Sequence, residues 1–258
     1  MNEIGYRIEE LVQIVDRLRG PNGCPWDREQ TNQSLIPYFI EEVYEVLESI
    51  DENNWDSLKE ELGDTLLHII FQASIAEEGK KFKFVDTIKN VNNKLIERHP
   101  HVFGKEKIDD IFNAKQNWEA FKYKEKGRES RLDGVPKSLP SLIKAQRLQQ
   151  KASYAGFDWD KIEKVWDKVN EEFLELKEAE IIGNNKKIEE EIGDLLFSIV
   201  NLSRHFDISA ENALRQTNRK FVRRFRKVEE KIKATGKELD EVNLEEMDSI
   251  WNQIKHNE

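Results

Sequence analysis

The sequence repeats itself once at a spacing of 130 residues, and this repeat constrains the fold more than any other feature. The segment LKEELGDTLLHII from Leu58 aligns with IEEEIGDLLFSIV from Ile188, so that Glu61 falls opposite Glu191 and Asp64 falls opposite Asp194. A repeat of this length is far longer than the roughly 20–50 residues of a solenoid repeat and is typical of a duplicated domain. We therefore predict two domains with one fold.

The repeat also predicts where the domains end. We expect a first domain at residues 1–125, a linker at 126–140 and a second domain at 141–258. In the linker, KGRESRLDGVPKSLP, glycine, proline and charged residues replace the periodic apolar pattern on either side.

Apolar residues recur at helical spacing along most of the chain. The first run, from Ile4 to Leu18, stops at RGPNG, where glycine and proline do not continue a helix. A later helix is predicted to begin at Ser57, which with Glu60 forms an S-x-x-E capping box, and to stop at Gly79. No segment combines two-residue alternation with hairpin turns. The predicted fold class is all-α, with duplicated helical domains.

Composition narrows the classes of partner. The formal net charge is -10, which argues against general binding to nucleic acid or to an anionic membrane, because neutralising phosphates requires a basic surface. The single cysteine, Cys24, excludes an intramolecular disulfide. The most apolar stretch, TLLHIIFQASIA, is far shorter than the roughly 20 residues of a membrane span, and the N-terminus does not resemble a secretory signal. We expect a soluble cytoplasmic protein with no nucleic-acid or membrane partner.

Acidic residues interrupt helical segments that are otherwise apolar. Glu42 and Glu45 are three residues apart and share a helix face, as do Glu61 and Asp64 on the next predicted helix. The short connection DENNWDS favours antiparallel neighbours, which would bring the four carboxylates together. Carboxylate oxygens suit Mg²⁺ or Mn²⁺. The same spacing recurs in the second repeat, so the candidate metal ligands are Glu42, Glu45, Glu61 and Asp64, and Glu172, Glu175, Glu191 and Asp194.

A solvated acidic surface is the alternative interpretation, because E-E-x-x-E patterns are common on the exposed faces of charged helices. Two observations favour the metal site. The spacing of 19 residues from Glu42 to Glu61 recurs from Glu172 to Glu191. A glycine also lies inside the helix in both repeats, at Gly63 and Gly193, where it costs about 1 kcal/mol relative to alanine. We expect a backbone or a ligand to approach closely there.

Basic pairs accompany the carboxylates in both repeats. Lys94 and Arg98 are four residues apart, as are Lys220 and Arg224, so each pair projects from one helix face as phosphate-binding side chains require. A solvated basic face and a nucleic-acid patch are the competing interpretations, and the net charge disfavours the second. Carboxylate-bound Mg²⁺ beside such a pair is an arrangement that binds a polyphosphate.

The order and duplication of these motifs resemble the MazG family of nucleoside triphosphate pyrophosphohydrolases. The resemblance rests on E-E-x-x-E followed by E-x-x-D in both repeats, and on CPWD, RHPHVF, GFDW and LEEMDSIW. It covers almost the whole chain. It implies an all-α homodimer that cleaves nucleoside triphosphates between the α and β phosphates, with Mg²⁺ as cofactor, to a nucleoside monophosphate and pyrophosphate. Nucleotide-pool cleaning and stress signalling are the roles associated with this family.

The resemblance also assigns residues. In the second repeat, Glu172, Glu175, Glu191 and Asp194 would hold Mg²⁺, and Lys187, Lys220, Arg224 and Trp251 would contact the nucleotide. The first repeat keeps the four acidic positions with Lys94 and Arg98, but has Ser57 opposite Lys187. The sequence therefore does not assign the nucleotide contacts of the first repeat. In the family, the second half is the better-supported catalytic site.

Catalysis would need a group that orients water. Glu171, or Glu41 in the first repeat, is the candidate, because it is the neighbouring acidic residue that is not assigned as a metal ligand. Glu175 is assigned both as a metal ligand and as a catalytic residue. A di-iron carboxylate site would require Glu-x-x-His, which neither Glu61 nor Glu191 provides. The second alternative is a non-catalytic nucleotide- and metal-binding regulatory dimer, which release of pyrophosphate would exclude. No pattern in the sequence indicates which nucleobase the protein prefers.

Overall fold

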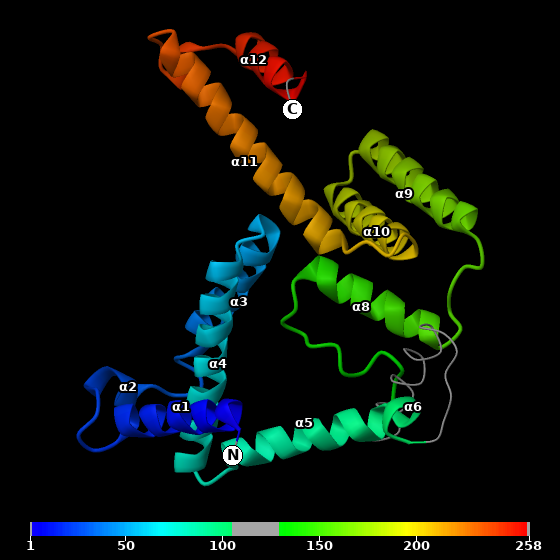
Figure 1. The fold of residues 1–258 in the computed structure, drawn as a ribbon. Helices are drawn as coiled ribbons and strands as arrows, with labels where there is room; N and C mark the ends of the chain where they lie inside the picture. Colours follow the sequence, from blue (N-terminus) through cyan, green and yellow to red (C-terminus); the bar gives the residue numbers. More distant parts are fainter. Residues whose placement is uncertain (1, 105–128, 257–258) are drawn as a thin grey trace. The chain divides into compact units, whose positions relative to one another are not determined.

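The computed structural model describes residues 2–104 and 129–256 of the chain. Every regular element in these residues is a helix, which confirms the prediction of an all-α fold. The helices form two compact units, at residues 1–109 and 110–258 (Figure 1). The predicted domain end at residue 125 and the first linker residues, 126–128, lie outside the described residues. Residues 129–140 contain turns and no helix.

The first unit is built on one long pair of helices, α3 and α4, with α1 packed against α4 and α5 following it. A small core joins α1 to α4, with Val15, Leu35, Ile70 and Phe71 at its centre. The helices are α1 (Glu3–Arg19), α2 (Pro25–Glu29), α3 (Ile36–Glu52), α4 (Trp55–Glu78), α5 (Phe84–Arg98) and α6 (Pro100–Phe103).

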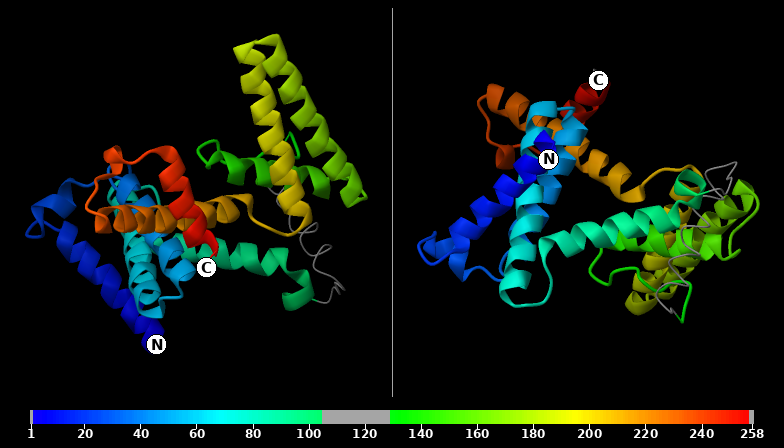
Figure 2. Two further views of the ribbon diagram at one scale, coloured as in Figure 1. Left: turned by 90° about the horizontal axis from the view of Figure 1, so that it is seen from above. Right: turned by 60° about the horizontal axis from the view of Figure 1, so that its bottom comes forward.

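The second unit repeats the central pair as α9 and α10, which lie side by side in both Figure 1 and the left view of Figure 2. Helix α8 packs against α10 and α11, and α12 packs against α11 through a cluster that includes Val228, Ile232 and Ile254. The elements are α8 (Ser141–Tyr154), α9 (Ile162–Ile182), α10 (Asn185–His205), α11 (Ala210–Ala234), the short 3₁₀ helix η1 (Leu239–Glu241) and α12 (Leu244–His256).

The turn inside each long pair is the same in both units. Asn53 and Gly183 end the first helix in the left-handed conformation, with φ of 54° and 73°. The next residue, Asn54 or Asn184, caps the second helix with its side-chain oxygen. Glycine and asparagine are the residues that adopt left-handed conformations at least cost. These turns place the acidic faces of the two helices opposite each other.

The predicted helix start at Ser57 is wrong. Helix α4 begins two residues earlier, at Trp55, and its cap is Asn54, whose side chain accepts a hydrogen bond from the Ser57 backbone N–H. The Ser57 hydroxyl is instead within hydrogen-bond distance of Ser49 Oγ, at 2.7 Å. The predicted stop at Gly79 is confirmed, because α4 ends at Glu78.

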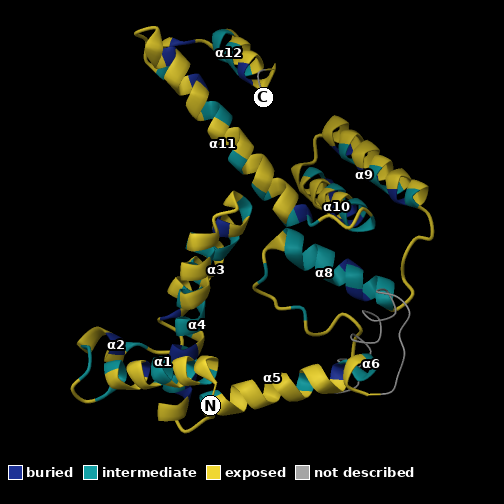
Figure 3. Cartoon of the chain, in the orientation of Figure 1, coloured by how far each residue is buried: buried dark blue, intermediate teal, exposed yellow. Residues whose placement is uncertain are grey.

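The expected close approach at the two helical glycines is absent from the described parts of this single chain. A Cβ atom built at Gly63 or Gly193 meets no neighbouring atom within 4 Å. Both positions lie on exposed stretches of their helices. Figure 3 shows that much of α9, α10 and α11 is likewise exposed. None of the helices in the described ranges has the length and apolar character that crossing a membrane requires.

Candidate metal and nucleotide site

A cluster of three carboxylates lies between α9 and α10. Glu172 and Glu175 come from α9 and Glu191 from α10, and each offers an oxygen atom that lies within 4.8 Å of the others. Glu172 and Glu191 are 5% and 4% exposed, whereas Glu175 is exposed. Burying two like-charged carboxylates beside a third is unfavourable without cations.

The first unit contains the corresponding cluster between α3 and α4. Glu42, Glu45 and Glu61 each offer an oxygen atom, and these three atoms also lie within 4.8 Å of one another. The fourth predicted ligand of each repeat lies beside its cluster, outside the group of three. Asp194 lines the same pocket as Glu172. Burial, then the charge of Glu45 and then that of Asp64 raise the pKa of Glu42.

Two lysines balance the second cluster. Lys168 Nζ lies 2.5 Å from an oxygen of Glu172 and 2.8 Å from an oxygen of Glu171, and Lys187 Nζ lies 2.9 Å from an oxygen of Glu191. The hydrogen bond to Glu171, followed by that to Glu172, raises the pKa of Lys168, and the hydrogen bond to Glu191 raises the pKa of Lys187. Both lysines are therefore cationic at neutral pH.

Glu175 has no such direct cationic partner among the described residues. Partial desolvation, followed by the charges of Glu191 and Glu172, raises its pKa, and Lys168 opposes this only in part. A bound cation would relieve this repulsion.

The first cluster has a different charge balance. Tyr38 and Ser57 occupy the positions that correspond to Lys168 and Lys187. Burial, followed by the neighbouring acidic groups, raises the pKa of Glu42, and desolvation and Glu45 raise that of Glu61. A basic group beside this cluster is His68, whose Nε2 lies 3.9 Å from an oxygen of Glu42, and burial lowers the pKa of His68. A neutral imidazole does not offset these carboxylates.

The second cluster fits a hard divalent cation. One oxygen of Glu191, Oε2, is buried and has no hydrogen-bond partner among the described residues. A buried carboxylate oxygen without a partner is costly and is uncommon in native proteins. A cation held by several carboxylate oxygens, as Mg²⁺ and Mn²⁺ prefer, would satisfy this atom and the excess negative charge together.

The predicted nucleotide residues are only partly brought to these clusters. Lys187 is at the second cluster, paired with Glu191. Lys220 and Arg224 lie on α11 and Trp251 lies on α12. In the described structure α11 contacts α10, and neither α11 nor α12 contacts α9. The Trp251 ring instead packs against the Phe221 ring, with the two ring centroids 5.3 Å apart. The Cζ atom of Arg224 lies over the Trp251 ring, 5.8 Å from its centroid.

The remaining predicted residues differ in their position relative to the two clusters. Lys94 and buried Arg98 lie on α5, which contacts α4 but not α3 in the described part of the first unit. Glu41 is exposed on α3. Glu171, the predicted water-orienting residue of the second repeat, is exposed and paired with Lys168.

Lys168 is a residue of the site that the sequence interpretation missed. Its signal was present: it precedes Glu171 by three residues and Glu172 by four, the spacings at which helical side chains meet. The repeat obscured this signal, because Tyr38 occupies the corresponding place and the predicted residues were mostly those shared by both repeats.

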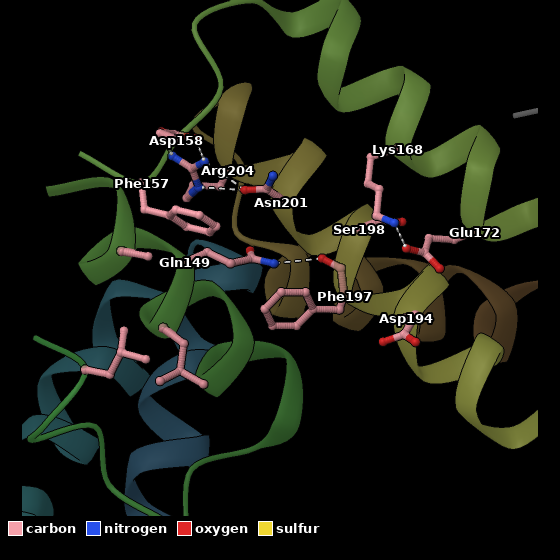
Figure 4. A pocket seen from close by; sticks show the side chains of 13 residues that line it. Gln149, Phe157, Asp158, Lys168, Glu172, Asp194, Phe197, Ser198, Asn201 and Arg204 are labelled. Carbon is pink, nitrogen blue, oxygen red and sulfur yellow. Dashed lines mark hydrogen bonds and ion pairs between the residues drawn. The ribbon is translucent and has the colours of Figure 1, made fainter. Parts of the chain in front are cut away.

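A pocket of about 460 Å³ opens beside the second cluster. This volume falls within the roughly 300–1,000 Å³ of small-molecule sites. Figure 4 shows the pocket between α8, α9 and α10, with Glu172 and Asp194 at the side of the acidic cluster. Its other lining residues are Leu132, Leu148, Gln149, Ala152, Phe157, Asp158, Lys168, Phe197, Ser198, Asn201 and Arg204.

An ion pair closes one wall of this pocket. Arg204 Nη2 and Nη1 lie 2.5 and 2.8 Å from the two oxygens of Asp158, and the Arg204 side chain is 12% exposed. Burial would raise the pKa of Asp158, but the hydrogen bond and charge of Arg204 lower it overall. The pair anchors the segment before α9 to the end of α10.

Asp158→Asn is expected to lower the free energy of unfolding by about 1–3 kcal/mol at pH 7, because it weakens a bidentate, charge-assisted contact to the partly buried guanidinium of Arg204. Thermal or urea unfolding measures this. Asp160→Asn is the matched control: its partner Lys164 is exposed, and no measurable change is expected.

The contribution of Asp158 to stability depends on pH. Because the pKa of Asp158 is lowered in the fold, this contribution is complete above the ordinary carboxyl pKa and is lost as the pH falls through the lowered value. Equal melting temperatures for wild type and Asp158→Asn at pH 7 would contradict this account.

The comparisons with known proteins agree with this geometry. The family model of the MazG nucleotide pyrophosphohydrolase domain matches residues 30–103 and 161–229, so each match contains one acidic cluster. The chain is 49% identical over 257 residues to a Thermotoga maritima protein named nucleoside triphosphate pyrophosphohydrolase/pyrophosphatase MazG, covering 99% of this chain and 98% of that protein. It is 43% identical over 258 residues to the Escherichia coli K12 nucleoside triphosphate pyrophosphohydrolase, covering 98% of each. It is also 47% identical to the Bacillus subtilis protein YabN, covering 98% of this chain and 52% of that protein.

Proposed function

Because this chain belongs to the MazG nucleotide pyrophosphohydrolase family, we propose that the carboxylate cluster of α9 and α10 is where it hydrolyses nucleoside triphosphates to monophosphate and pyrophosphate. The observation that carries this assignment is the pairing of buried carboxylates with two lysines, next to a pocket of suitable size. An enzyme that consumes nucleoside triphosphates is expected in the cytoplasm, where these substrates are formed.

We propose Mg²⁺ as the cofactor, with Mn²⁺ as a substitute. Glu172, Glu175, Glu191 and Asp194 would hold it, and the buried Oε2 of Glu191 supports this choice. When bound, such an ion polarises phosphoryl oxygens and lowers the pKa of a coordinated water.

The lysines then have a role in binding the triphosphate. Lys187 is half-exposed and bonds only one oxygen of Glu191 in the structure, so its ammonium can reach a phosphate oxygen at the edge of the cluster. Cations positioned where charge develops stabilise the departing pyrophosphate. Glu171 is proposed to orient the attacking water, with Lys168 holding its carboxylate in place.

We propose that the working protein is a homodimer in which each site uses both copies. Within one chain, Lys220, Arg224 and Trp251 lie on helices that do not contact α9 in the described residues. The same unit exposes large apolar side chains on α9, α10 and α11. On α9 and α10, Phe173 is 46% exposed, Ile182 68% and Leu196 50%. On α11, Phe221 is 55% exposed and Val222 46%. Exposed apolar surfaces of this kind mark protein interfaces. Docking α11 and α12 of one copy over α9 and α10 of the other would cover both surfaces and complete the site.

We assign turnover to the second repeat. The first cluster lacks the counterparts of Lys168 and Lys187, so it would bind a cation without the lysines that balance the second cluster. A structural or regulatory role follows for the first repeat.

The direct test is to measure pyrophosphate and monophosphate from a panel of nucleoside triphosphates with Mg²⁺, with and without EDTA. Both products are expected in equal amounts, with none in EDTA and recovery on adding Mg²⁺ or Mn²⁺. Release of orthophosphate alone would contradict cleavage between the α and β phosphates. Tight nucleotide binding without any product would favour the non-catalytic regulatory dimer.

A further inference from the structure

We propose that the pocket beside the second carboxylate cluster is the subsite for the nucleobase, and that Gln149 binds the base by accepting a hydrogen bond from one of its N–H groups. This inference rests on the proposed function and deepens it. The pocket is continuous with the carboxylate cluster, because Glu172 belongs to the cluster and lines the cavity, together with Asp194. A triphosphate bound at the carboxylates therefore has room for its nucleoside on the side of α8.

Gln149 is a buried polar group whose acceptor has no partner in the described part of the chain. It comes from α8, is 8% exposed, and donates through Nε2 to the backbone oxygen of Phe197 at 2.8 Å. That bond fixes which end of the amide is the oxygen. Oε1 is buried and has no hydrogen-bond partner among the described residues. A buried carbonyl oxygen without a donor is a position to which a ligand can contribute one.

The walls of the pocket suit a flat, apolar ring. Phe157 is 83% exposed and Phe197 is 45% exposed, although both line the cavity. In the view of Figure 4, the Gln149 amide extends from α8 toward α10 with one of these two rings on either side. Aromatic side chains stack on nucleobases of every kind, and a hydrogen-bonding group between them fixes the orientation of the base.

The first repeat fills the corresponding space with larger side chains. Arg19 stands opposite Gln149 and bonds Glu78 at 2.6 and 2.8 Å, so it is committed to an ion pair. His68 stands opposite Ser198, and its ring centroid lies 6.0 Å from that of Phe39. Phe71 stands opposite Asn201 and is part of the core, at 6% exposure. The two repeats thus share the carboxylates and differ at the pocket.

The chemistry of the ligand follows from the lone acceptor. The amino groups of adenine and cytosine and the ring N–H groups of guanine and uracil can all donate to Gln149 Oε1. The triphosphate alone has no N–H to offer. Gln149 should therefore contribute to the affinity for nucleotides and contribute nothing to the affinity for inorganic triphosphate.

Binding measurements separate these two ligands. We would determine by calorimetry, with Mg²⁺, the affinity of the full-length protein for α,β-methylene analogues of the four nucleoside triphosphates and for inorganic triphosphate. In Gln149→Leu, the affinity for at least one of the analogues should fall about tenfold, because one hydrogen bond is lost and the shape is retained, with the affinity for inorganic triphosphate unchanged. Ser198→His introduces the side chain that the first repeat has at this position. It should lower the affinity for the analogues at least as much and leave the affinity for inorganic triphosphate unchanged.

Each other result overturns a defined part of the proposal. Equal losses for analogues and inorganic triphosphate would make Gln149 a packing residue and overturn the nucleobase subsite. Unchanged affinities for every ligand in both variants would do the same and would leave Trp251 as the group that stacks on the base. If the wild type binds none of the analogues, the proposed function itself fails, and this inference fails with it.

Discussion

Glu175→Gln is expected to reduce pyrophosphate release by at least about 100-fold, whereas Glu45→Gln, the matched change in the first repeat, should leave most of it. The amide cannot supply the negative oxygen that Glu175 contributes to the cluster with Glu172 and Glu191. Because Glu175 is exposed, the substitution should not harm folding. It also removes the repulsion that raises the pKa of Glu175, so the melting temperature without metal should stay the same or rise. Product release at saturating substrate measures the first effect and calorimetric melting the second.

The pair of variants discriminates between the two repeats. Both changes remove one carboxylate charge from equivalent places on α9 and α3. If Glu45→Gln abolishes activity as strongly as Glu175→Gln, both repeats work or are coupled, and the assignment of turnover to the second repeat is wrong. Full activity of Glu175→Gln would remove the carboxylate cluster from the mechanism.

Mixing two variants that each have low activity is expected to restore activity. Glu175→Gln disables the carboxylate side of a site, and Lys220→Ala, an exposed change on α11, should disable the phosphate side by about 10–100-fold. If each site combines α9 and α10 of one copy with α11 of the other, a mixed dimer holds one intact site and one doubly changed site. Random exchange makes about half of the dimers mixed, so about a quarter of wild-type activity should return.

The control for this experiment is a mixture of Glu175→Gln with Glu191→Gln, which lie in the same cluster and should not complement. Native mass spectrometry with one variant isotope-labelled reports whether subunits have exchanged. If a demonstrated mixed dimer of Glu175→Gln and Lys220→Ala stays inactive, each site lies within one chain and the shared-site arrangement is wrong. A monomer with wild-type activity would contradict it as well.

Much of the fold could be read from local sequence signals. The apolar periodicity and the glycine stops predicted helices whose ends, such as the stop before Gly79, the structure confirms. The start of α4 was missed because Ser57 satisfies a capping pattern of its own. The real cap, Asn54, stands in the polar turn DENNWDS, where several residues could serve as a cap. Only the hydrogen bond that Asn54 accepts from the Ser57 N–H distinguishes the two.

The candidate site could also be predicted in part from the sequence. Helical spacing and the repeat were enough to group Glu172 and Glu175, and the short turn was enough to bring Glu191 opposite them. Asp194 was predicted as a fourth ligand of the same kind, and the structure places it beside the group of three, along the pocket. Its role as a ligand stays a prediction. Lys168 was missed because it has no counterpart in the first repeat.

The all-α fold, the duplication and the acidic clusters follow from the amino-acid sequence, because they depend on spacing along a helix and on comparison of the chain with itself. Which groups are buried and which lack a partner depends on three-dimensional packing. Gln149 and Glu191 each have a buried oxygen without a partner among the described residues, in helices that pack together although they are distant in sequence. The same packing leaves α11 and α12, which carry Lys220 and Trp251, without contact to α9 within the described part of one chain. No periodicity records such contacts, because the crossing of two helices is set by how their surface side chains interlock.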